Sequence, residues 1–439
     1  MKDDKLFLEI KSALKNIEIF DTHEHLMYES ERRTKKLDFF MAFYFYTSTS
    51  LVSSGMKLKE MEKLQDPCIS LKNKWDIVSP YWDFLRSTMD FKVISIVAND
   101  IFGVEKINLE SIVEITEKIN ETKRVEHYKN ILKERSKISF VVNDIDNFGE
   151  FGVKKIVPDE DYFLPVIRLD RLMNANSAES IEKIEEENNI NINSLANLIE
   201  LIDNIFEQRK GRIYALKTAI AYCRDLFFED VSFSDAEKCF IKILKLNNYT
   251  NRRNDSISLD EIRPFQDFIY HYLIKKALDN DLPIQIHTGI IDGNANDIRN
   301  TNPAHLTNLL LKYKNAVFDI FHIGYPFTDE LIAMVKMFPN CFVNMCWIPH
   351  FSKYLYKQSL NLFMDILPSN KIFGFGGDYL FVEGTYAAQK IAREAIAEVI
   401  YERVLNKDIS IDDGINFTER ILNKNAEHVY LKKESAESA

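Results

Sequence analysis

The sequence predicts an α/β protein of the (β/α)8 TIM-barrel class with a helical cap inserted after the first strand. Short apolar runs rich in Val, Ile and Phe recur along the chain, and from residue 138 onward they alternate with longer amphipathic stretches. Eight such runs can be counted, and several are apolar throughout, as expected for strands covered on both faces. An open, doubly wound sheet is the alternative, but eight strands with helices between them favour a closed barrel.

The eight expected strands are short and leave one long gap near the amino terminus. They are residues 17–21, 138–142, 163–168, 213–219, 283–288, 317–322, 341–346 and 372–377. A bare barrel needs about 250 residues, so a chain of 439 residues must carry insertions. The largest, roughly 27–136, opens with the aromatic run Phe39–Tyr46 and continues in amphipathic helical patterns. We expect it to cap one barrel end, within a single domain that spans residues 1–439.

Composition and charge argue against several classes of function. The 67 acidic residues outnumber the 56 basic ones and give a formal net charge of -11, which favours neither a nucleic-acid backbone nor an anionic membrane surface as partner. No stretch approaches the roughly 18 apolar residues of a membrane span, and the amino terminus lacks the apolar segment of a secretion signal. A cytoplasmic protein that acts on a small molecule is therefore expected.

Two histidines, separated by a single residue, lie at the end of the first expected strand. Side chains alternate across a strand, so His23 and His25 point to the same side and can share one metal ion. With nine histidines in the chain, roughly 0.2 such pairs arise by chance. The motif therefore needs support from its position in the fold.

Three further side chains follow strands on the same rim of the expected barrel. His287 ends the fifth strand, His322 ends the sixth, and Asp378 follows the eighth. Active sites of such barrels are built at the carboxyl ends of the strands, and imidazoles with a carboxylate suit a borderline divalent ion. In the plain alternative, each histidine is a satisfied core or surface residue and Asp378 caps the following helix.

This pattern, with the stretches IEIFDTHEHL, FDIFHIGYPF and IFGFGGDYLF, resembles the amidohydrolase superfamily, in particular its amidohydrolase-2 branch near the uronate isomerases. The likeness covers residue 17 to about residue 400. It implies one divalent metal, usually zinc, bound by His23, His25, His287 and Asp378. Manganese, iron and cobalt suit the same ligands. The resemblance also implies that Asp378 takes a proton from the metal-activated water and that His322 polarises or protonates the substrate.

Four residues near the same rim are candidates for substrate binding. Lys217 lies on the expected fourth strand, where some members of the superfamily carry a carboxylated lysine that bridges two metals. An unmodified lysine that binds an anionic group is the favoured interpretation, and a surface lysine is the plain one. Arg168 and Arg224 follow the third and fourth strands and can each clamp a carboxylate, or simply form salt bridges at the rim. Trp347 follows the seventh strand and is expected to line the pocket.

The expected function is hydrolysis of a small anionic metabolite through metal-activated water. Uronate isomerisation is an alternative within the same fold, and decarboxylation or metabolite binding without turnover are others, since one fold hosts many chemistries. The segment Phe39–Tyr46 can pack against the barrel or against a second subunit, so a homo-oligomer is also considered. Neither nucleic acid nor a membrane is an expected partner.

Overall fold

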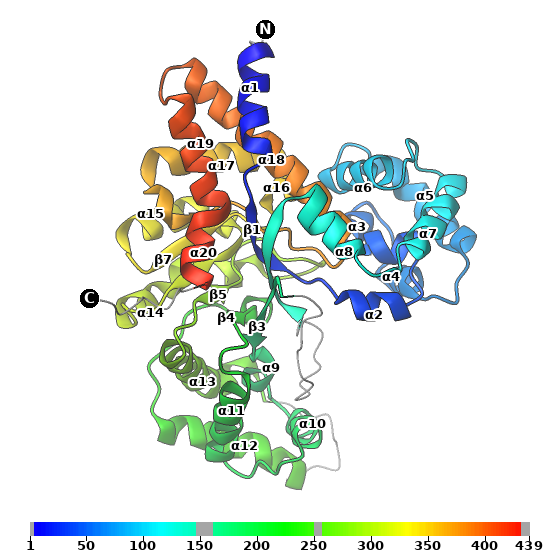
Figure 1. Cartoon of the computed structure of the whole chain (residues 1–439). Coiled ribbons are helices and arrows are strands. Elements are labelled where there is room, and N and C mark those ends of the chain that lie inside the picture. Colours follow the sequence, from blue (N-terminus) through cyan, green and yellow to red (C-terminus); the bar gives the residue numbers. More distant parts are fainter. Residues whose placement is uncertain (1–3, 146–160, 250–256, 432–439) are drawn as a thin grey trace.

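The computed structural model describes residues 4–145, 161–249 and 257–431 of the chain (Figure 1). Its centre is one sheet of eight parallel strands that pair in sequence order from β1 to β8. The strands are β1 (Ile19–Glu24), β2 (Ile138–Asn143), β3 (Phe163–Arg168), β4 (Ala215–Thr218), β5 (Ile284–Ile286), β6 (Phe318–Ile320), β7 (Cys341–Asn344) and β8 (Ile372–Phe373). All eight expected strands are present, several of them shorter than the apolar runs that predicted them.

Backbone hydrogen bonds just beyond β8 bring the end of the sheet back to β1. The Thr22 amide donates to the carbonyl oxygen of Phe375 at 3.2 Å, and the Asp378 amide donates to that of His23 at 2.9 Å. β1 also shows register shifts against β2, a local irregularity that is common beside active sites. The eight strands form a nearly closed barrel, which confirms the predicted fold class.

Helices surround this barrel and bury the outer faces of its strands. Isoleucines of β5 and β6, for example, are fully buried because the barrel interior covers one side and helices cover the other. The helices outside the cap are α1 (Asp4–Lys15), α9 (Asp170–Met173), α10 (Ala178–Asn188), α11 (Leu195–Arg209), α12 (Phe233–Tyr249), α13 (Leu259–Asp279), α14 (Thr307–Lys312), α15 (Thr328–Met337), α16 (Ile348–Phe351), α17 (Lys353–Ile366), α18 (Val382–Leu405), α19 (Ile411–Glu419) and α20 (Asn425–Tyr430). Within the described residues, no helix is both long and apolar enough to cross a membrane.

The segment between β1 and β2 is a helical lobe beside the barrel, as the sequence predicts (Figure 1). Its helices are α2 (Glu29–Thr34), α3 (Phe39–Ser53), α4 (Leu58–Gln65), α5 (Leu71–Leu85), α6 (Met89–Asp100), α7 (Leu109–Glu121) and α8 (His127–Lys129). α3 begins after Asp38, whose carboxylate accepts a hydrogen bond from the Met41 amide at 2.9 Å. The aromatic run of α3 packs into the hydrophobic core. That the whole chain forms one domain stays a prediction.

Candidate metal centre and substrate cavity

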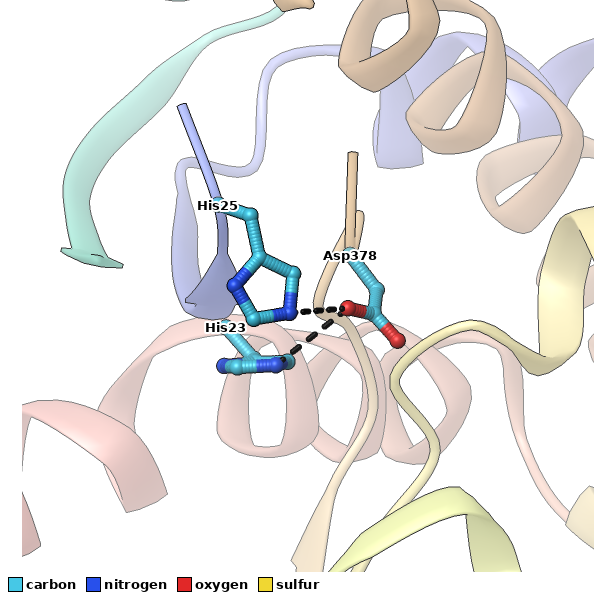
Figure 2. A group of neighbouring side chains, drawn as sticks. All are labelled: His23, His25 and Asp378. Atoms are coloured by element: carbon cyan, nitrogen blue, oxygen red, sulfur yellow. Dashed lines mark ion pairs between the residues drawn. The ribbon is translucent and has the colours of Figure 1, made fainter. Parts of the chain in front are cut away.

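Three of the four predicted metal ligands converge where β1 ends and the chain leaves β8 (Figure 2). Nε2 of His23 lies 3.2 Å, and Nε2 of His25 lies 3.1 Å, from the same Oδ1 atom of Asp378. The ligand atoms of the three side chains all lie within 4.8 Å of one another. Gly377 makes this approach possible, since a Cβ atom there would lie 1.9 Å from Oε1 of Glu24.

His287 joins this group through His322. Nδ1 of His287 lies 3.2 Å from Nε2 of His322, and that Nε2 atom lies 3.8 Å from Oδ2 of Asp378. Among the described residues, His287 is not one of the three whose ligand atoms lie mutually close. The structure therefore places it beside the cluster, and its role as a fourth ligand stays a prediction.

Hydrogen bonds to backbone carbonyls indicate which nitrogen carries the proton in three of these rings. The donors and acceptors are His25 Nδ1 to the Asp144 oxygen (2.9 Å), His287 Nε2 to the Ile290 oxygen (2.8 Å) and His322 Nδ1 to the Cys346 oxygen (3.0 Å). A carbonyl oxygen only accepts, so each of these nitrogens must donate. In the neutral ring the other nitrogen then presents a lone pair, as a metal ligand requires.

Those lone pairs face one another and a carboxylate. Burial lowers the pKa of His322 to about 4 and the pKa of His23 to about 3, so both rings are neutral near pH 7. Burial by itself would raise the pKa of Asp378, and positive charge or N–H donors on the side of His23 and His25 lower it well below its usual value. Lone pairs facing a carboxylate repel unless a cation lies among them. The residues present therefore fit a divalent metal ion.

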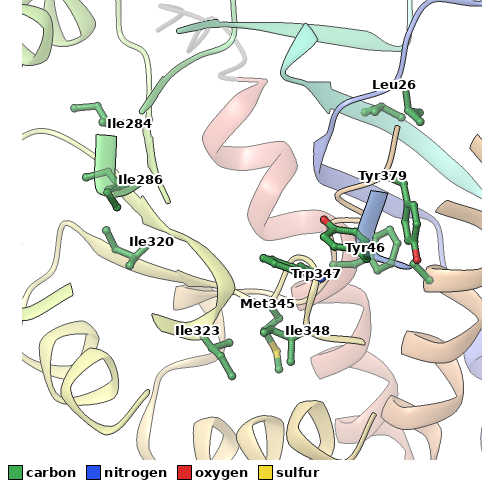
Figure 3. Packing of buried hydrophobic residues seen from close by; sticks show 14 of the residues in the cluster. Leu26, Tyr46, Ile284, Ile286, Ile320, Ile323, Met345, Trp347, Ile348 and Tyr379 are labelled. Carbon is green, nitrogen blue, oxygen red and sulfur yellow. The ribbon is translucent and has the colours of Figure 1, made fainter. Parts of the chain in front are cut away.

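A cavity of about 220 Å³ lies against this cluster and suits a small metabolite. His25, His287 and Asp378 line it on the side of the cluster. The other lining residues are Phe45, Tyr46, Arg168, Lys217, Ala219, Tyr222, Asp292 and Trp347. Trp347, a predicted pocket residue, stacks on Tyr46 of α3 with ring centroids 4.6 Å apart (Figure 3). The cap thus supplies aromatic walls, and the barrel supplies the polar groups.

Lys217 gives one wall of the cavity a positive charge. Its Nζ atom is buried, has no hydrogen-bond partner among the described residues, and lies 3.5 Å from the ring centroid of Phe321. Burial lowers the pKa of Lys217 to about 8, and the nearby Asp144 limits that decrease. A buried ammonium group without a hydrogen-bond acceptor is unfavourable, so an anionic ligand would satisfy it.

Arg168 lines the same cavity from the end of β3. Its Nε atom donates to Asp170 at 2.9 Å, and its Nη1 atom lies 3.4 Å from Oδ2 of Asp144. The side chain is still 18% exposed, whereas that of Asp144 is fully buried. Two carboxylates therefore hold the guanidinium group in place at the cavity wall, which fixes its orientation for a ligand.

Arg224 is not among the residues that line this cavity, so the interpretation that it binds substrate is corrected. Its Nη1 atom donates to Oδ1 of Asp267 at 2.7 Å and to Oε1 of Gln266 at 3.2 Å, and both partners are buried. The guanidinium also lies over the ring of Phe228, 4.7 Å from its centroid. A short helical turn after β4 separates residue 224 from the strand. Arg224 therefore anchors α13.

Replacing Arg224 with methionine should destabilise the protein without changing substrate affinity. The substitution keeps the aliphatic packing but leaves the Asp267 carboxylate buried without its partner. Breaking a buried pair in this way costs about 3–5 kcal/mol. Urea unfolding measures the loss, and steady-state kinetics on the folded fraction should give an unchanged KM. A KM that rises at least about tenfold would return Arg224 to the substrate site.

Tyr46, Asp144 and Asp292 are among the site residues that were not singled out from the sequence. The Tyr46 hydroxyl donates to the backbone oxygen of Asp378 at 2.6 Å, and Asp144 accepts contacts from both His25 and Arg168. Asp292 lies in the loop after β5 and lines the cavity. Asp144 and Asp292 follow strands on the rim that also carries the histidines, and that position is the signal that could have identified them.

Comparisons with known structures show the fold. A uronate isomerase from Thermotoga maritima superposes with a TM-score of 0.75 at 15% sequence identity and covers 97% of both chains. A protein from Lactobacillus casei, to which metal-dependent hydrolase activity is attributed, superposes with a TM-score of 0.67 at 13% identity, over 98% of this chain and 99% of that chain.

The sequence itself carries a family signature. Residues 256–431 match the model of the amidohydrolase family. These residues, fewer than half of the chain, are similar to the amidohydrolase family. The match includes His287, His322, Trp347 and Asp378 and agrees with the resemblance to the amidohydrolase superfamily. The structural likeness to a uronate isomerase shows that the two proteins share a fold.

One curated protein is similar to part of this chain. Protein fluG from Emericella nidulans is 26% identical over 185 residues, which are 41% of this chain. The matched region spans about a fifth of that protein, 21% of its length. The activity of the whole fluG protein is therefore not carried over to this chain.

Proposed function

We propose that this protein is a metal-dependent hydrolase of the amidohydrolase superfamily that acts on a small anionic metabolite. The observation that carries the proposal is the convergence of His23, His25 and Asp378 on one point beside a cavity. Their geometry and protonation states suit a divalent cation, with zinc as the first choice and manganese, iron or cobalt as alternatives. Such a cation, when bound, supplies Lewis acidity and activates water for attack.

Residues of this chain would transfer protons, orient the substrate and limit access of water. Asp378, held ionised and close to two imidazoles, is placed to accept a proton at its carboxylate and to deliver it to a leaving group. His322 offers Nε2 on the same side, since its Nδ1 atom is bound to the Cys346 oxygen. Lys217 and Arg168 orient the anionic group of the substrate. Tyr46 and Trp347 cover the cavity and limit access of water.

Removal and return of the metal test this proposal. Dialysis against a strong chelator should abolish hydrolysis in a screen of small lactones, uronates and N-acyl acids. Stoichiometric zinc, manganese, iron or cobalt should restore it. Elemental analysis before and after dialysis identifies the native metal. Full turnover by the metal-free protein would contradict the proposal.

Uronate isomerisation is the second candidate, because the fold matches a uronate isomerase over 97% of both chains. In that reaction the site would move protons between sugar carbons and break no bond to a leaving group. Product analysis on glucuronate separates the two functions. A ketose of unchanged mass identifies an isomerase, whereas a hydrolase leaves glucuronate unchanged.

A further inference from the structure

Asp292 brings a second carboxylate into the cavity and is not one of the mutually close residues that fit the metal. It lies on the loop after β5 and lines the cavity together with Lys217 and Arg168. Its Oδ1 atom accepts a hydrogen bond from the Thr49 hydroxyl of α3 at 3.0 Å. The Gly293 amide donates to that same hydroxyl at 3.1 Å. The cap and the β5 loop therefore hold this carboxylate in one orientation.

The charges around Asp292 do not compensate its own. In the described part of the chain, no lysine, arginine or histidine forms an ion pair with it, whereas the nearby carboxylates of Asp378 and Asp90 oppose its ionisation. Burial, followed by these two charges, raises the pKa of Asp292 to about 6, although the Thr49 hydroxyl lowers it in part. The hydroxyls of Tyr44, Tyr46 and Tyr222 also lie near it. An anion held in such surroundings is stabilised by a cationic ligand.

The same cavity carries the opposite charge on Lys217, whose buried Nζ atom has no hydrogen-bond partner within the described residues. We propose that Asp292 binds an ammonium group of the substrate while Lys217 and Arg168 bind its anionic group. The substrate class is then a small zwitterion, an amino acid or a derivative of one with a free amine. This inference rests on the proposed function, which supplies the hydrolysis reaction, and it specifies the class of substrate that the same site binds.

Ligand series that differ in one group test the inference directly. The probes are L-glutamate, L-2-hydroxyglutarate and glutarate, and the shorter series L-aspartate, L-malate and succinate. Isothermal titration calorimetry on zinc-loaded protein near pH 7.5 measures their affinities without turnover. L-glutamate or L-aspartate should bind about tenfold tighter than its hydroxy and unsubstituted analogues. A pocket that binds an ammonium group rejects analogues that lack this group. Equal or tighter binding by the counterparts, or no binding by either amino acid, would overturn the inference.

The isosteric variant Asp292→Asn assigns the preference to this side chain. It keeps the oxygen that accepts from Thr49 but removes the charge. The variant should bind the preferred amino acid about tenfold more weakly and bind the unsubstituted diacid with little change. Asp297→Asn, an exposed substitution in the same loop, is the matched control and should retain the wild-type preference. A preference that survives in Asp292→Asn would contradict the assignment.

A stability measurement gives a second readout that needs no ligand. The folded pKa of Asp292, about 6, lies above its ordinary value of 3.8, so the folded state binds this proton more tightly than the unfolded state does. Wild-type stability should therefore fall, relative to Asp292→Asn, as the pH rises from about 4 through about 6. Urea midpoints that keep the same difference at all pH values would refute an uncompensated carboxylate at this position.

The outcomes also separate this inference from the proposed hydrolase. A protein that prefers the amino members but hydrolyses nothing would keep the inference and refute the hydrolase proposal. A metal-dependent hydrolase that prefers the unsubstituted diacids would support the hydrolase proposal and refute this inference.

Discussion

Replacing both His23 and His25 with alanine is expected to remove bound metal and activity together. Both Nε2 atoms face the same oxygen of Asp378, so the double variant leaves only one carboxylate of the mutually close ligand set. A site reduced to one ligand should not retain zinc through dialysis. Activity should fall by at least about 10⁴-fold, since the activated water is lost with the metal. Elemental analysis and initial rates on the same samples measure both effects.

An exposed histidine provides the control for this experiment. His428→Ala changes the same residue type on the surface of α20 and should leave metal content and rate at wild-type levels. Circular dichroism should show that the double variant remains folded, because the substitutions act at strand ends and beyond. A double variant that keeps stoichiometric metal or full activity would refute the assignment of these ligands.

His322→Asn is expected to separate catalysis from metal binding. Asparagine can place its amide nitrogen where Nδ1 donates to the Cys346 oxygen, but it has no counterpart of Nε2. The rate should therefore fall by about 10²–10⁴-fold, the range for a lost general acid or base, while the metal content stays at the wild-type value. His271→Asn is the buried control, because its Nδ1 atom contacts the Tyr313 hydroxyl and neither residue lines the cavity.

The result would assign the role of His322 in either case. Loss of metal together with activity would make it a ligand, in place of the proton-transferring role that the superfamily resemblance implies. Retention of both metal and rate would show that the histidine only supports the loop after β6 and has no part in the reaction.

The rim histidines could be predicted because a parallel barrel leaves few choices for the end of each strand. Once the apolar runs define eight strands, the residues that follow them must meet at one end. His23, His25 and Asp378 lie where that rule puts them. The strand limits were less accurate, since β5 and β6 contain three residues each and the flanking apolar residues lie outside the strands.

Arg224 and Tyr46 show what the sequence pattern does not contain. Arg168 is the last residue of the third strand, whereas a helical turn lies between the fourth strand and Arg224. The counterion of Arg224, Asp267, comes from a later helix. Tyr46 reaches the backbone of Asp378 across 332 residues of sequence. Periodicity predicts that α3 is a helix with a buried face, but it does not specify which part of the barrel that face covers.

The location of the metal tests the account most directly. A crystal of the zinc-loaded protein, measured on both sides of the zinc absorption edge, should show one anomalous peak about 2.0–2.2 Å from Nε2 of His23, Nε2 of His25 and a carboxylate oxygen of Asp378. The same map decides whether Nδ1 of His287 completes the set. A peak outside this cluster, with the three side chains binding no ion, would contradict the metal site and the hydrolytic function built on it.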